Sequence, residues 1–134
     1  MNKISIGKLF ELYCDIFEKF GTHILVESDA MIGYYVFEQN VVNIGFCSNR
    51  ILNYLLMEGL IDGNIKEKSS LLLTKFWALE KTNFWNVKSI RTSPEWNEVM
   101  ELSDEIKQLI KARWDDEELQ AIFDIEKENE LSGD

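Results

Sequence analysis

The fold is decided by the stretch from Asn64 to Trp114, whose sequence is NIKEKSSLLLTKFWALEKTNFWNVKSIRTSPEWNEVMELSDEIKQLIKARW. Between Asn64 and Lys81 apolar residues recur mostly at spacings of three and four, which predicts an amphipathic helix. A second helix is predicted to begin at Ser93-Pro94. Serine can accept the free N–H groups of a first turn, and proline at the next position loses no hydrogen bond. The apolar residues that follow again lie mostly on one stripe, so we expect a helical hairpin.

The connector between the two arms, Thr82 to Val87, contains Phe84 and Trp85 and is too bulky for a free linker. Trp85 has two interpretations. It either plugs the top of the hairpin or lies at a contact surface, where aromatic residues tend to dominate the binding energy.

Before the hairpin, the first segment predicts an amphipathic helix. Its apolar face consists of Ile6, Leu9, Phe10, Tyr13, Ile16, Phe17 and Phe20, and its other face mainly of Lys8, Glu11, Asp15, Glu18 and Lys19. Gly21 is expected to end this helix in the left-handed conformation that often terminates helices.

Three short β-branched and aromatic runs follow, at residues 24–26, 34–37 and 41–44. Turn-prone residues separate them, which predicts a small antiparallel sheet of two or three strands. Short apolar runs do not separate strand from helix well, so a partly helical segment is the alternative. The predicted fold class is therefore α+β, a mostly helical single domain with a small antiparallel sheet near its N-terminal half.

Two further helices complete the expected domain. Ser48 is predicted to cap a helix from Asn49 to Glu58, which Gly59 can terminate. A last helix, Asp115 to Glu128, begins with four acidic residues where a helix N-terminus stabilises negative charge. The expected globular domain spans residues 1–128, and residues 129–134 are expected to form a disordered acidic tail.

The charge is unevenly distributed along the chain. The formal net charge of the whole is −10, and residues 115–134 hold nine of the 24 acids with one of the 14 bases. This balance argues against nucleic acid or an anionic membrane surface as a partner, because both need clustered Lys and Arg. The N-terminus lacks the apolar run of a signal peptide or membrane span. The two cysteines are far apart in the sequence, which favours reduced, buried thiols over a disulfide. We expect a cytoplasmic protein.

Residues that could perform chemistry are few. The only histidine, His23, could pair with Cys14 through the fold, but it more simply suits the carbonyl end of the first helix. Neighbouring acids such as Glu101 and Glu105 lie beside the apolar stripe, as on a solvated helix face. The glycines are isolated and no cluster has metal-ligand spacing, so no catalytic residue, metal or cofactor is expected.

The acidic end has two interpretations. It can be a solvated helix face with a frayed tail, or a docking surface for a basic protein, since clustered charge accelerates association and disfavours wrong partners. Leu119, Ile122 and Phe123 would add apolar contact to such a helix. The candidate partner-binding residues are Asp115, Asp116, Glu117, Glu118, Asp124 and Glu126, with Trp85 as a candidate anchor.

The stretch Phe84-Trp85-Asn86-Val87, with Ser93 to Asp104 after it, resembles helical segments in small bacterial immunity proteins of polymorphic toxin systems, including contact-dependent growth inhibition. The resemblance covers about a third of the chain. It implies a small, acidic, cytosolic protein that neutralises a cognate toxin domain, frequently a basic nuclease, by occluding its active site. The expected function is thus an inhibitory binding protein and not an enzyme. The alternatives are a self-associating structural or regulatory adaptor and an enzyme centred on His23.

Overall fold

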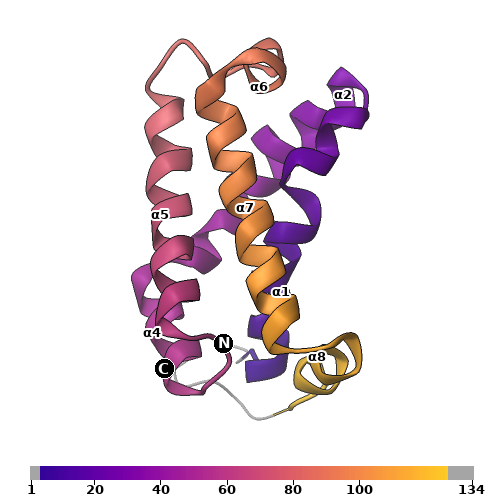
Figure 1. Ribbon diagram of the computed structural model, residues 1–134, viewed down its shortest axis with the longest axis vertical. Helices are drawn as coiled ribbons and strands as arrows, with labels where there is room; N and C mark the ends of the chain where they lie inside the picture. Colours follow the sequence, from indigo (N-terminus) through magenta and orange to yellow (C-terminus); the bar gives the residue numbers. More distant parts are fainter. Residues whose placement is uncertain (1–3, 127–134) are drawn as a thin grey trace.

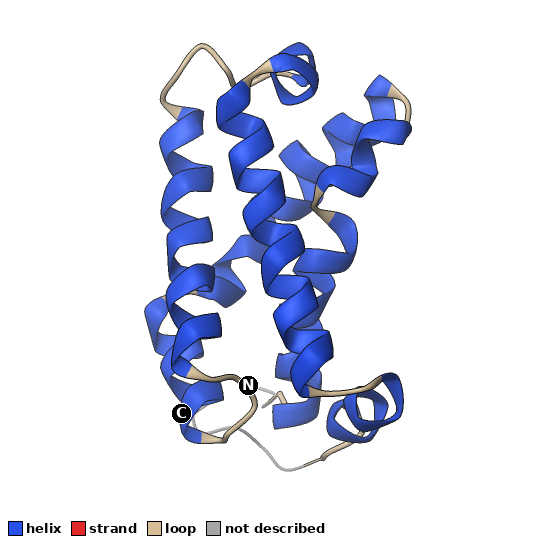
Figure 2. Ribbon diagram, in the orientation of Figure 1, coloured by secondary structure: helices blue, strands red, loops and turns tan. Residues whose placement is uncertain are grey.

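The computed structural model describes residues 4–126, and within that range the regular elements are all helices (Figures 1 and 2). The longer ones are α1 (Ile6–Lys19), α4 (Asn49–Met57), α5 (Gly63–Glu80), α7 (Pro94–Arg113) and α8 (Asp116–Phe123). In Figure 1, α5 and α7 lie side by side along the long axis of the molecule. α1 packs against α7, and α8 packs against α1 at the opposite end from the α5–α7 connector.

The predicted hairpin of α5 and α7 is confirmed. α5 begins one residue earlier than expected because the carboxylate of Asp62 accepts a hydrogen bond from the backbone N–H of Ile65 at 2.8 Å. α7 begins at Pro94, and Ser93 accepts from the backbone N–H of Trp96 as predicted. The connector also contains a short helix that was not expected, α6 (Val87–Thr92).

The predicted antiparallel sheet is wrong. The chain from residue 22 to 47 consists of helical pieces, and no strand is present in the described part of the chain (Figure 2). The pieces are the 3₁₀ helix η1 (Thr22–Val26), α2 (Asp29–Gly33), the π-helix η2 (Tyr34–Asn40), α3 (Val41–Asn43) and the 3₁₀ helix η3 (Ile44–Cys47). The fold is therefore mostly helical and not α+β.

The buried positions of this segment explain the correction. Ile32, Val36, Asn40 and Ile44 are buried at a uniform spacing of four, whereas a half-buried strand would bury every second residue. A spacing of four exceeds the α-helical 3.6 and suits a stretch whose hydrogen bonds reach the fifth residue. Burial against the core therefore overrides the local β preference of the sequence.

α1 ends at Lys19 rather than through a left-handed glycine. Gly21 has φ 166°, which is extended backbone, so the predicted left-handed termination is wrong. Its lack of a side chain serves packing, because a Cβ there would collide with Oδ1 of Asp104 on α7. The Asp104 carboxylate accepts the backbone N–H of Thr22 at 3.2 Å and the Thr22 hydroxyl at 2.5 Å. Asp104 of α7 thus accepts the hydrogen bonds of Thr22, just after the end of α1.

The remaining two predicted helices are present, and both are shorter than predicted. Ser48 caps α4 as predicted, and Gly59 follows it with φ +77°, the left-handed conformation that ends helices. α8 ends at Phe123, five residues before the predicted end. Residues 127 and 128, like the tail expected at 129–134, lie outside the described residues.

Aromatic rings fill the centre of the core. Phe20, Phe76 and Trp96 are fully buried and meet edge to face, with ring centroids 5.9–6.4 Å apart. Such pairs add about 0.5–1.5 kcal/mol beyond the area they bury. The indole N–H of Trp96 donates to the carbonyl of Phe84 at 2.6 Å, so its polar atom is satisfied. This cluster joins the end of α1 to both arms of the hairpin.

Candidate partner-binding site

Two of the four acids at the start of α8 are occupied in holding the helix together. The Asp115 side chain accepts from the backbone N–H of Glu118 at 2.8 Å, and the Glu118 side chain accepts from the backbone N–H of Asp115 at 2.9 Å. This reciprocal capping box satisfies two backbone donors that a helix start otherwise leaves unpaired. It explains why a helix with three acids in its first turn forms here.

The other acids of the predicted set differ in their surroundings. Asp116 and Glu117 are exposed, and no ion pair to either is found within residues 4–126. Asp124 accepts a hydrogen bond from the Gln120 side chain at 3.1 Å, and Glu126 is exposed beyond the end of α8. Asp116 and Glu117 are therefore the acids of α8 best placed to meet a partner.

α8 is fixed to the start of α1 by close backbone contact. The N–H of Gly7 donates to the carbonyl of Ile125 at 3.2 Å, which satisfies a first-turn donor of α1. A Cβ on Gly7 would lie 2.6 Å from the carbonyl oxygens of Ile122 and Ile125. Phe123 also packs against Phe10, with ring centroids 6.0 Å apart. A glycine is thus required for α8 to lie where it does.

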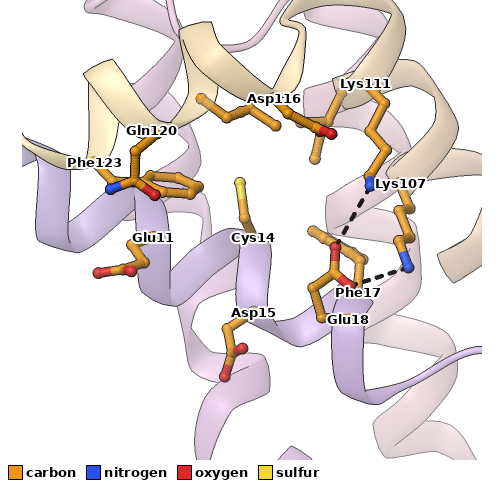
Figure 3. Close-up of a pocket in the computed structure, with 12 residues that line it drawn as sticks. Glu11, Cys14, Asp15, Phe17, Glu18, Lys107, Lys111, Asp116, Gln120 and Phe123 are labelled. Carbon is orange, nitrogen blue, oxygen red and sulfur yellow. Dashed lines mark ion pairs between the residues drawn. The ribbon is translucent and has the colours of Figure 1, made fainter.

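A pocket of about 250 Å³ lies between α1, α7 and α8, and we call it the α8 pocket (Figure 3). Its lining is Glu11, Cys14, Asp15, Phe17 and Glu18 of α1, Lys107, Ile110 and Lys111 of α7, and Asp116, Leu119, Gln120 and Phe123 of α8. Within each helix these positions are mostly three or four apart, so each helix turns one face to the pocket. The lining combines an apolar floor with four carboxylates and two lysines.

Both lysines of the α8 pocket are held by one carboxylate. The Nζ of Lys107 lies 3.2 Å from Oε2 of Glu18, and the Nζ of Lys111 lies 4.0 Å from Oε1 (Figure 3). Glu18 is half exposed, so each pair is worth at most about 1 kcal/mol. The charges at this end of the pocket are therefore largely compensated.

The thiol of Cys14 points into the α8 pocket (Figure 3). Burial raises the pKa of Cys14 well above its ordinary value, and the negative charges of Glu18, Asp15 and Glu11 raise it further. Since the thiolate is the reactive form, this cysteine is a poor nucleophile at neutral pH. It contributes a small, neutral, apolar surface to the pocket floor.

Cys14 and His23 do not form a dyad. The Nε2 of His23 lies 2.7 Å from the carbonyl oxygen of Glu18, as expected of a residue at the end of α1. No hydrogen bond between His23 and Cys14 is present in the described part of the chain. Residues 4–126 also contain no group of three or more His, Cys, Asp or Glu side chains able to hold a metal ion.

Trp85, the candidate anchor, lies far from the acids of α8. It is half-buried, with ring centroids 4.9 Å from Phe37, 5.3 Å from Phe76 and 5.6 Å from Trp96. The connector that holds it and α8 lie at opposite ends of α7, whose 20 residues span about 30 Å (Figure 1). The structure therefore does not bring Trp85 onto one surface with the acids, and its ring contacts favour the plug interpretation.

Sequence reasoning missed the part of the pocket that α1 supplies. Glu11, Asp15 and Glu18 were assigned only to the polar face of the first helix. Their spacing of four and three does place them on one line. Nothing in the sequence indicates that the acidic last helix packs beside that line.

Comparison with known proteins gives no match: no family model, no curated protein and no solved structure corresponds to this chain. Among the described helices, none has both the length and the apolarity that crossing a bilayer requires.

Proposed function

We propose that this chain is an inhibitory protein-binding domain, an immunity protein that neutralises a basic toxin domain by covering its active site. The observation that supports it is the gathering of acids at one end of the molecule. There α1 and α8 contribute four carboxylates to the lining of the α8 pocket. Within residues 4–126 the ion-pair partners of two of them, Glu11 and Asp15, are lysines of α1 itself. A basic nuclease is the partner class that such a surface fits best, because carboxylates can occupy the positions of substrate phosphates.

The rigidity of α8 supports the same proposal. The capping box and the contact of Gly7 with Ile125 hold the helix at both ends before any partner arrives. A surface that is ordered in advance loses less conformational entropy on binding. Exposed acids on such a helix also steer a basic partner toward it, with rate gains of about 10 to 1,000-fold.

Inhibition is tested with candidate basic toxin domains, taken first from the reading frames beside this chain in its native genome. We expect the activity of one such domain to fall to zero at one equivalent of this chain. Full activity of all of them in the presence of a large excess would contradict the proposal.

The role of α8 is tested by reversing charge without breaking the capping box. Asp116→Lys with Glu117→Lys is compared with Glu67→Lys and Glu80→Lys, exposed acids of α5 that give the same net charge. We expect association with the toxic domain to slow about tenfold or more for the α8 pair, with a weaker salt dependence. Equal slowing by the α5 pair would show that net charge, and not α8, is responsible.

A further inference from the structure

We propose that the α8 pocket receives one arginine side chain of the basic partner, with its guanidinium at the end formed by Glu11 and Gln120. This inference rests on the proposed function, since it names the group of the partner that anchors the complex. It concerns a site that the acidic residues of α8 alone do not define.

The dimensions of the pocket suit a single long side chain. Its volume of about 250 Å³ lies below the roughly 300–1,000 Å³ of typical small-molecule sites. It extends along α8 from Asp116 to Phe123, about 10 Å at 1.5 Å per residue. A space of this volume and length can hold one unbranched side chain.

The floor of the pocket is apolar along its middle. Cys14, Phe17 and Leu119 line it, and the Cys14 thiol carries no charge at neutral pH. Arginine buries the methylene groups of its side chain against such surfaces while its charged head meets polar groups. The middle of the pocket therefore matches the stem of an arginine.

The two ends of the pocket differ in their capacity to receive a cation. At one end the carboxylate of Glu18 is already occupied by Lys107 and Lys111, which leaves little net negative charge there to attract a guanidinium. At the other end, where Gln120 and Phe123 lie in Figure 3, the lining contains no lysine. A guanidinium is therefore directed to the Gln120 end.

Two acceptors are present at that end. Within residues 4–126 the ion-pair partner of Glu11 is the exposed Lys8, at 3.5 Å, a contact worth little in water. Gln120 donates its amide to Asp124, which leaves its side-chain oxygen available as an acceptor. A guanidinium presents several N–H donors in a planar fork, which suits two separate acceptors better than the single charged nitrogen of a lysine does.

The proposal is tested with a probe that requires no partner protein. The amide spectrum of the ¹⁵N-labelled chain is titrated with n-butylguanidinium, and with n-butylurea as a neutral molecule of the same shape. We expect n-butylguanidinium to shift amides of α1 and α8 around the pocket with a dissociation constant of about 10 mM, the order expected for so few atoms. No saturable shift, or equal shifts with n-butylurea, would overturn the proposal.

Single substitutions test whether n-butylguanidinium binds in the α8 pocket. Glu11→Gln should weaken n-butylguanidinium binding severalfold, and Cys14→Met, which fills the floor, should abolish it. Glu117→Gln removes an exposed acid of α8 that does not line the pocket and should leave binding unchanged. Equal weakening by Glu117→Gln would overturn the proposal. Inhibition of the toxic domain without binding of the probe would remove this inference alone. Binding of the probe without inhibition would remove the proposed function and leave a guanidinium-binding pocket with no toxin to anchor.

Discussion

Cys14 shows how the environment of one residue decides its chemistry. It faces a pocket, yet burial and three nearby carboxylates raise its pKa and keep the thiol protonated. We predict that Cys14 reacts with a disulfide reagent at pH 8 at least about tenfold more slowly in the native chain than in the chain unfolded in urea. The rates are measured with Cys47→Ala as the background. Equal rates would contradict the protonated, shielded thiol.

Two buried groups that can lose a proton, a thiol and a phenol, limit the stability of the protein at alkaline pH. Burial raises the pKa of Cys47 from 9.0 to about 12 and that of Tyr13 above its ordinary 10.0. Because the unfolded chain releases these protons at lower pH than the folded chain, stability is complete below about pH 9 and falls as pH rises further. Urea unfolding between pH 8 and 11 should show this decline. The decline should be shallower in Cys47→Ala, and an identical slope would contradict the assignment.

Replacing Trp85 by alanine distinguishes a structural role of this side chain from a binding role. Its ring contacts with Phe37, Phe76 and Trp96 predict that Trp85→Ala lowers the free energy of unfolding by about 2–3 kcal/mol, less than for a fully buried tryptophan. The rate of association with the basic partner should remain unchanged, since Trp85 is remote from α8. A stable variant that binds more slowly would instead make Trp85 a contact residue.

At the scale of elements, the position of α8 depends on one glycine. We predict that Gly7→Ala destabilises the chain by about 1–3 kcal/mol, since its Cβ would collide with the carbonyls that end α8. Hydrogen exchange should accelerate most in α8. The control is Gly63→Ala in the first turn of α5, where the added Cβ meets nothing within 4 Å. Faster exchange in both variants, or in neither, would contradict the packing described.

The elements that sequence predicts are those with a local signal. Ser48 and Ser93 mark helix starts, and apolar spacing marks α1, α5 and α7. Between residues 22 and 47 the local signals conflict, because Ser28 caps α2 while the residues that follow favour strands. The β-branched and aromatic runs prefer strands locally, and packing of Ile32, Val36 and Ile44 against the rest of the core favours the helices instead.

At the scale of the molecule, the acidic end could be predicted and the site within it could not. The charge of residues 115–134 is visible in composition. The α8 pocket, however, depends on α8 folding back beside Glu11 and Cys14, about a hundred residues earlier in the sequence. The sequence gives no distances, so it cannot show that the length of α7 separates Trp85 from the acids of α8.

The central claim is that the partner binds at the α8 end of the molecule. Hydrogen exchange of this chain, measured free and in complex with a toxic domain that it inhibits, tests that claim most directly. We predict slower exchange in α8 and in the pocket-facing part of α1 on binding, with the α5–α6 connector unchanged. Protection confined to the connector around Trp85, with α8 exchanging as in the free chain, would contradict it.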